Sequence, residues 1–236
     1  MPVCASGCGA PRSQGFKPAS CAADPTLAEV TVSDVPSIKG SAFAFVVEKI
    51  QKLLAAGDLS RNELARCLPS GGLAVLDQPI VFIGWYDIRI YAGLMELLRD
   101  IAGGGKNDYL VRHGCEAAER LLQKGLYQQL EYLKRMEFGK ETDPEVRYQA
   151  FGRDLRLLIS LGPSILNFGH QQVKSDPEHT KRYMLEISDA GAYPEVLCWT
   201  TQGFNNRMAA AHDTPDLWRW ERPRTDLVRY RMTRAL

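Results

Sequence analysis

The chain has 236 residues, of which 45% are hydrophobic and 24% are charged, and its formal net charge is +1. This composition is typical of a globular domain with a packed core, and the near-zero charge excludes a strong overall field for nucleic acid or a membrane surface. No apolar run approaches the ~20 residues of a membrane-spanning helix, and the N-terminus lacks the charged and apolar regions of a signal peptide. We therefore predict a cytoplasmic protein without a membrane span.

Residues 1–38 have the composition of a flexible leader, because small residues and prolines dominate and no periodicity is sustained. Within it, segment 27–33 is compatible with either a short strand or a docking peptide. Three of the six cysteines lie in the leader, and no histidine is near enough in sequence to complete a zinc site. We predict free thiols there, no metal, and a single folded domain over 39–236.

The first half of this domain has the apolar periodicity of helices. The apolar residues of segment 41–58 fall on one face of a predicted helix, with Ser41 as the expected N-cap and Gly57 as the expected C-terminal stop. Residues 59–68 begin with the Ser-x-x-Glu spacing of a capping box. The Pro-Ser-Gly-Gly that follows leaves no recognition helix, so a DNA-binding helix-turn-helix is not predicted.

The next two helices are longer. The apolar run 80–85 is expected to continue directly into a helix that ends at the glycines 103–105, which do not match a phosphate-binding loop. A single helix is expected over 107–136. On it, Gly114, Ala117 and Ala118 would let another backbone approach closely, at a tight helix crossing or at a homodimer seam.

The second half of the domain changes from helical to mixed periodicity. After a break at 138–144, a helix over 145–169 should be kinked or split at Pro163. The remainder predicts a half-buried strand, a helix and a hairpin. The expected fold class is α/β (α+β), with a helical half packed on a small antiparallel sheet. The three final elements cover 182–191, 193–213 and 217–234, with the hairpin loop at 222–226.

The C-terminal hairpin is locally basic. The only acidic residues near its arginines in the sequence are Glu221 and Asp226. The arginines therefore form either a solvated strand face or a patch for an acidic partner. The arginines are Arg219, Arg222, Arg224, Arg229, Arg231 and Arg234.

No catalytic motif is present in the sequence. His113 and Cys115 are the nearest thing to a reactive pair, but on a helix positions i and i+2 point about 200° apart, so they cannot act together. We expect Cys115 to pack as a small hydrophobe and the protein not to be an enzyme. The C-terminal aromatic residues are either ordinary core or the wall of a cavity or interface.

The segment 197–234 resembles the end of the vinyl-reductase-type small-molecule-binding domain, and of the related haem–nitric-oxide-binding and TRAPP-subunit folds. In these a helix with a Cys-x4-Gly core leads into a two-stranded hairpin, and Cys198 and Gly203 hold that spacing. The segments 83–98 and 111–125 are similar to an uncharacterised myxobacterial paralogous family. The resemblance covers about 40–234, and its matching positions are Trp85, Tyr91, Gly114, Gly125 and Gly203.

This resemblance implies a domain that binds a ligand or a partner. Its zinc-binding members carry clustered C-terminal cysteines, whereas only Cys198 lies in that region here. Its haem-binding members need a Tyr-x-Ser-x-Arg motif. Residues 230–234 match this motif only loosely, and they lie at the wrong end of the chain. We therefore expect neither zinc nor haem.

The function expected on these grounds is a non-catalytic sensory or regulatory domain that binds a hydrophobic small molecule or a signalling partner. A TRAPP-like protein–protein scaffold without a ligand is the alternative, and an enzyme of unknown class is the third. We also expect a homodimer. The residues expected to line the pocket are Trp85, Tyr91, Tyr109, His113, Trp199 and Phe204.

Overall fold

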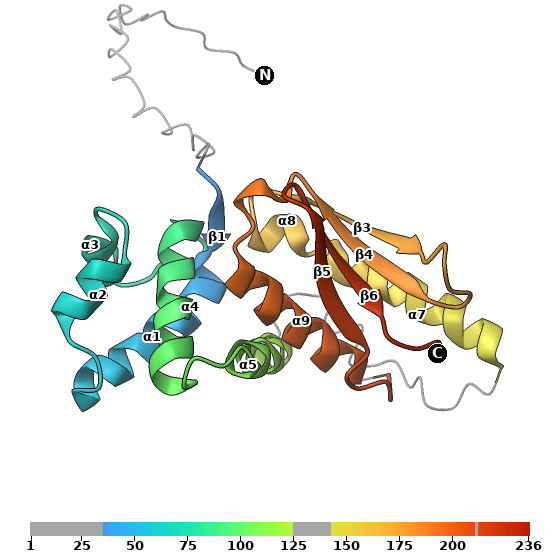
Figure 1. The fold of residues 1–236 in the computed structure, drawn as a ribbon, viewed down its shortest axis with the longest axis horizontal. Coiled ribbons are helices and arrows are strands. Elements are labelled where there is room, and N and C mark those ends of the chain that lie inside the picture. Colours follow the sequence, from blue (N-terminus) through green and yellow to red (C-terminus); the bar gives the residue numbers. More distant parts are fainter. Residues whose placement is uncertain (1–34, 125–142, 211) are drawn as a thin grey trace, which may run out of the picture. The chain divides into compact units, whose positions relative to one another are not determined.

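The computed structural model describes residues 35–124, 143–210 and 212–236, which fold into a mixture of helices and small antiparallel sheets (Figure 1). The α+β class predicted from the sequence is thus confirmed. In chain order the elements are β1 (Ser37–Lys39), α1 (Gly40–Ala56), α2 (Arg61–Cys67), α3 (Gly72–Leu76), β2 (Trp85–Asp87), α4 (Ile88–Ala102), α5 (Asp108–Lys124), α7 (Pro144–Ile159), α8 (Gly162–Ile165), β3 (His170–Ser175), β4 (Tyr183–Ser188), a 3-10 turn (Ala190–Ala192), α9 (Glu195–Ala210), β5 (Trp218–Arg224) and β6 (Leu227–Met232).

Helix α1 buries the predicted apolar stripe against α4, and it ends at Gly57 as expected. Gly57 adopts φ 81°, which glycine tolerates without strain, and donates its N–H to the Leu54 carbonyl. The N-cap predicted at Ser41 is wrong, because the helix begins at Gly40 with Lys39 as its N-cap. Gly40 packs closely on the loop before β2, where an added Cβ would lie 2.0 Å from the Val81 carbonyl oxygen. The capping box predicted at Ser60 and Glu63 is present.

Two short strands were not predicted. β1 pairs antiparallel with β2, and Ile38 on β1 is buried, so ordered structure begins before the expected boundary at 38. The apolar run 80–85 does not continue into a helix, because its last residue opens β2 and α4 starts at Ile88, capped by Asp87. The three glycines end α4 as predicted. Segments 27–33 and 125–136, with Gly125, lie outside the described residues.

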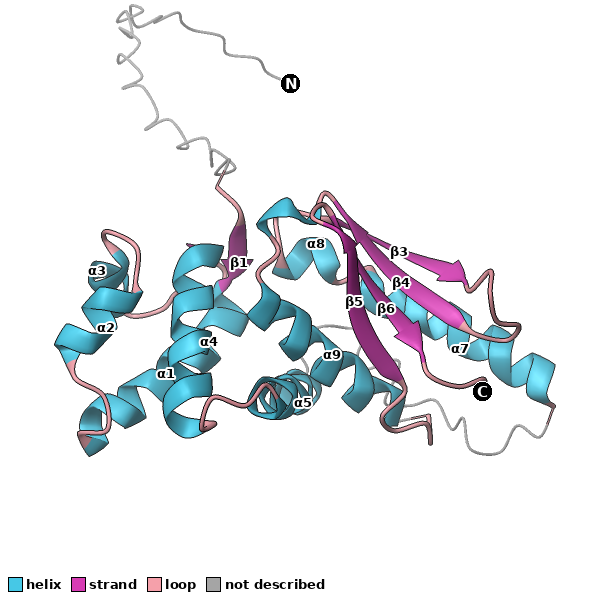
Figure 2. Ribbon diagram, in the orientation of Figure 1, coloured by secondary structure: helices cyan, strands magenta, loops and turns pink. Residues whose placement is uncertain are grey.

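The main sheet has the order β3-β4-β6-β5, and all its pairs are antiparallel (Figure 2). Strand β3 was missed by the sequence prediction because its residues are mostly exposed and polar. The predicted break at Pro163 is confirmed, since α7 ends at Ile159 and the short α8 follows. The hairpin connection is shorter than the five-residue loop expected, because β5 extends to Arg224 and only Thr225 and Asp226 form the turn.

Strand β4 is buried along almost its whole length, and not on one face only as predicted. Tyr183 packs on α7, where its ring stacks on Tyr148 with centroids 4.3 Å apart. On the other face Glu186 is buried under basic side chains. Its carboxylate pairs with Lys174 and, at 2.8 Å, with Arg229. Long charged side chains cover a strand face that the alternation pattern marks as solvent-exposed.

Helices α5 and α9 cross at unusually close range. A Cβ on Gly114 would lie 1.9 Å from the Thr200 carbonyl oxygen, and a Cβ on Gly203 would lie 1.9 Å from that of Val111. The tight crossing predicted from Gly114 is therefore present, and the backbone that approaches it belongs to the same chain.

The free edge of strand β5 is covered by amide side chains of α9. Asn206 Oδ1 accepts from the Trp218 N–H at 2.7 Å, and Asn206 Nδ2 donates to the Trp218 carbonyl at 3.3 Å. One turn earlier, Gln202 accepts from the Trp220 N–H at 3.0 Å. Residues four apart on a helix and two apart on a strand are both separated by ~6 Å, so the two sets of groups match in spacing.

Candidate functional site

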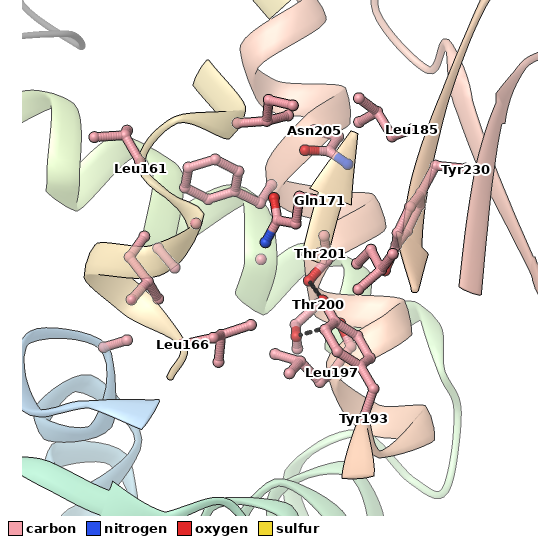
Figure 3. A pocket seen from close by; sticks show the side chains of 18 of the residues that line it. Leu161, Leu166, Gln171, Leu185, Tyr193, Leu197, Thr200, Thr201, Asn205 and Tyr230 are labelled. Carbon is pink, nitrogen blue, oxygen red and sulfur yellow. Dashed lines mark hydrogen bonds between the residues drawn. The ribbon is translucent and has the colours of Figure 1, made fainter. Parts of the chain in front are cut away.

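A cavity of about 140 Å³ lies between α5, α9, α8 and the helix-facing side of the sheet (Figure 3). Its wall is predominantly apolar, and among the described residues no lysine or arginine contributes to it. The residues that matter most to its chemistry are Tyr91, His113, Ala117, Gln171, Glu186, Tyr193, Thr200, Thr201, Phe204, Asn205 and Tyr230.

The cavity lies beside the α5–α9 crossing, which requires glycine at 114 and 203 because a Cβ at either position would meet the facing backbone at 1.9 Å. On the cavity side of α5, the small side chain of Ala117 leaves space in the wall. The break at Pro163 turns the chain into α8, which places Leu161, Ile165 and Leu166 on the opposite wall. The space is a consequence of packing geometry that a uniform set of large side chains would have closed.

The hydroxyl groups in the wall are bound to other protein groups. Thr200 donates to the Leu197 carbonyl at 3.1 Å, Thr201 and Tyr193 share a hydrogen bond of 2.7 Å, and Tyr230 donates to the Cys198 carbonyl at 3.2 Å. Burial raises the pKa of Tyr91 to about 12 and that of Tyr193 higher still. These phenols are neutral and supply no base.

Two buried polar atoms in the wall have no hydrogen-bond partner among the described residues, His113 Nδ1 and Asn205 Nδ2. The His113 ring stacks on Phe45, with centroids 4.6 Å apart. Burial, helped by the charges of Lys49 and Arg120, lowers the pKa of His113 to about 3, so its imidazole is neutral at physiological pH. The wall therefore offers neutral hydrogen-bonding groups and no free charge.

The structure brings together half of the residues predicted to line a pocket. Tyr91, His113 and Phe204 line the cavity. Trp85, Tyr109 and Trp199 do not line it: the ammonium of Lys39 lies over the Trp85 ring and that of Lys49 faces the Tyr109 ring, while Trp199 packs edge-on against Trp220. That any of the six binds a ligand stays a prediction.

The buried polar residues of α9 were missed in the sequence. Thr200, Thr201 and Asn205 occupy a helix that is buried on most sides, so apolar periodicity gave no signal for them. The run Gln-Gly-Phe-Asn-Asn, with three amides inside a buried helix, was the available clue. Tyr193 and Gln171 also line the cavity, and neither had been assigned a site role.

The pair His113 and Cys115 forms no reactive site. Cys115 donates its thiol to the Gly203 carbonyl at 3.2 Å, and burial raises its pKa. Within 35–124, 143–210 and 212–236, no group of three or more His, Cys, Asp or Glu residues could hold a metal ion. No helix in the described part of the chain is both long and apolar enough to cross a membrane.

A second, much smaller space of about 20 Å³ adjoins Asn205 on another side. It is lined by Asp154, which is 2% exposed, and by His212. Neither Asp154 oxygen accepts a hydrogen bond within the described residues, and the nearest cation is Arg153 at 3.5 Å. Burial raises the pKa of Asp154 to about 6. The space is large enough for one water molecule.

We expect Asp154→Asn to stabilise the protein at neutral pH. The folded pKa of about 6 exceeds the ordinary ~3.9 of an unfolded aspartate, so this carboxyl favours the folded state below pH ~4, and that contribution is lost as the pH rises through 6. Denaturant unfolding at pH 7.5 and pH 4.5 should show a gain in the free energy of unfolding that is about 1–3 kcal/mol larger at pH 7.5. The exposed Asp58→Asn is the control for loss of one charge. Equal effects at both pH values would contradict the assignment.

The fold and this cavity define a class: an α+β domain with a mostly apolar cavity beneath a four-stranded antiparallel sheet. No protein-family model and no curated protein matches the chain. Among solved structures, a crystal structure of the Fe(II) unliganded H-NOX protein mutant A71G from K. algicida is similar, with a TM-score of 0.49 and 12% identity over 83% of this chain and 95% of that one. A likeness of this size establishes neither family membership nor function.

Proposed function

We propose that the domain binds a small, neutral, largely apolar molecule in the 140 Å³ cavity and acts as a non-catalytic sensory or regulatory module. The observation that carries the proposal is the cavity itself: its volume, its apolar wall, and the absence of lysine and arginine from that wall among the described residues. An apolar cavity of about 150 Å³ is known to bind benzene or xenon, whereas pockets for drug-sized ligands are ~300–1,000 Å³. The ligand proposed is therefore of about benzene size.

The dimensions and chemistry of the cavity argue against haem. A haem is larger than the drug-sized ligands that occupy ~300 Å³ or more, and its propionates need cationic partners. The segment 230–234, which matches a haem-binding motif only loosely, supplies no cationic partner to the cavity. Tyr230 donates to the Cys198 carbonyl, and Arg231 pairs with Asp176 at 2.9 Å. His113 is the histidine of the wall, and no cationic side chain accompanies it there within the described residues. The residues present do not fit this cofactor.

A non-catalytic role is supported by the absence of a free hydroxyl or a charged side chain directed into the cavity among the described residues. The hydroxyls of the wall are bound to other protein groups, its phenols and its imidazole are neutral, and the Glu186 carboxylate is neutralised by Lys174 and Arg229. Such a wall supplies shape and a few neutral contacts. The scaffold alternative has support of another kind, since Val81, Phe82 and Ile83 are 50–79% exposed in the loop before β2.

We expect Ala117→Phe to abolish binding of a benzene-sized probe. Ala117 lines the cavity from α5, so a phenyl ring there would occupy the space. Benzene titrated into ¹⁵N-labelled protein should shift amide signals of the cavity wall in the wild type, and affinity should fall at least about tenfold in the variant, the factor that corresponds to 1.4 kcal/mol.

The matched control is Ala55→Phe, which adds the same ring at an exposed position of α1 and should bind benzene as the wild type does. Native mass spectrometry of freshly purified protein adds an independent measurement, in which a retained small molecule should be present in the wild type and absent from Ala117→Phe. If the wild type binds neither benzene nor any retained molecule, the proposed function is wrong.

A further inference from the structure

We infer that the ligand of this cavity carries one hydrogen-bond acceptor, a carbonyl or ether oxygen, and that Asn205 Nδ2 donates to it. The inference rests on the proposed function and specifies the chemical class of its ligand. It assigns to Asn205 the role of specificity-determining residue, because a hydrocarbon of the same shape would leave this donor unpartnered.

Among the buried amide and hydroxyl side chains of the wall, this group alone in the described residues lacks a partner, whereas Gln171, the other amide of the wall, is only half-buried. Thr200, Thr201, Tyr193 and Tyr230 all use their hydroxyls within the protein. Asn205 is 94% buried, since 6% of its surface is exposed, and its Nδ2 has no partner among the described residues. Figure 3 shows the Asn205 side chain on the cavity wall contributed by α9. Buried amide donors in native proteins are nearly always paired, so this one calls for a partner that the folded chain does not provide.

The other two buried amide side chains of α9 both have hydrogen-bond partners. Gln202 and Asn206, one turn apart on one face of the helix, are used to cover the edge of β5. Asn205 lies about 100° around the helix from Asn206 and therefore cannot reach the same strand edge. It lines the cavity instead, and it also adjoins the 20 Å³ space beside Asp154.

The partner of Asn205 should be a neutral acceptor. An anion would enter a wall that has no lysine or arginine among the described residues. A cation would find no free carboxylate there, because the Glu186 carboxylate lies on the opposite face of β4 and is paired with Lys174 and Arg229. His113, neutral and unpartnered at Nδ1, adds a second polar contact without charge. A compact ketone, ester or cyclic ether meets these conditions.

The test compares two probes with the same number of non-hydrogen atoms, cyclopentanone and methylcyclopentane, on the wild type and on Asn205→Leu. Leucine has the same number and branching of side-chain non-hydrogen atoms as asparagine, and it removes the donor. We expect the variant to lose about 3–10-fold in affinity for cyclopentanone, the factor of one ordinary hydrogen bond, and to lose none for methylcyclopentane. In the wild type, cyclopentanone should shift the Asn205 side-chain NH₂ signals in ¹H–¹⁵N spectra, and methylcyclopentane should not.

The outcomes separate this inference from the proposed function. If both probes bind the wild type and Asn205→Leu weakens neither or both equally, the cavity binds ligands and the role of Asn205 is wrong. An NH₂ signal unmoved by cyclopentanone overturns the inference even if the variant does not fold. Failure of both probes to bind the wild type contradicts the proposed function itself.

Discussion

Replacing Gly203 by alanine should destabilise the protein by about 2–4 kcal/mol, although alanine is the better helix former by ~1 kcal/mol. The added Cβ would lie 1.9 Å from the Val111 carbonyl oxygen, far inside any allowed contact, so α5 and α9 must separate and the core around their crossing must repack. Chemical denaturation followed by far-UV circular dichroism measures the change in the free energy of unfolding. A neutral or stabilising effect would mean that the helices are not as close as described.

The reciprocal glycine provides an internal check on this result. Gly114→Ala should have a loss of similar size, because its Cβ would meet the Thr200 carbonyl oxygen at 1.9 Å. The double variant should lose less than the sum, since one separation of the helices relieves both clashes. Gly191→Ala is the matched control, because a Cβ there meets nothing within 4 Å, and it should change stability by less than ~0.5 kcal/mol.

Asn206→Leu is expected to destabilise the protein by about 1–3 kcal/mol and to promote its association. The substitution leaves the buried Trp218 N–H without a partner, at a cost of ~1–3 kcal/mol, whereas the Trp218 carbonyl keeps the hydrogen bond that Arg219 donates at 2.8 Å. It also frees part of the β5 edge, and an open strand edge is a template for pairing with another chain. Thermal unfolding measures the first effect, and size-exclusion chromatography with light scattering measures the second.

The exposed Asn62→Leu on α2 is the control for an asparagine-to-leucine change in a helix. It should leave the midpoint of unfolding nearly unchanged and should not alter the elution volume. If Asn206→Leu behaves like Asn62→Leu, then strand β5 does not depend on α9 for its edge, and the amide pairing described here contributes nothing to stability.

Much of the fold was predictable because local patterns are enough to specify single elements. The stripe of α1, its stop at Gly57, the capping box at Ser60 and the break at Pro163 all follow from interactions between residues close in sequence. Strand β3 and the β1–β2 pair were not predictable in this way. Their residues gain an extended conformation only by pairing with partners that lie far away in the chain.

The charge pairing of the hairpin could not be predicted from local sequence either. In sequence, its arginines have only Glu221 and Asp226 nearby, which left an acidic-partner patch open. In the folded chain Arg229 pairs with Glu186, and Arg231 pairs with Asp176 and Glu178. Strand pairing β4–β6 brings Glu186 alongside the hairpin, and the connection between β3 and β4 supplies Asp176 and Glu178, so the apparent excess of positive charge is largely matched within the domain.

For the candidate site, the pattern of residues was enough to indicate that Gly114 permits a close crossing and that Tyr91, His113 and Phe204 occur on helices able to form a wall. The folded chain was needed to show that the crossing is with α9, that a space of about 140 Å³ remains beside it, and that Trp85, Tyr109 and Trp199 lie outside it. The difference arises because a cavity belongs to no single element. It is the volume left when several faces meet, and helical or strand periodicity specifies each face without specifying the gap between them.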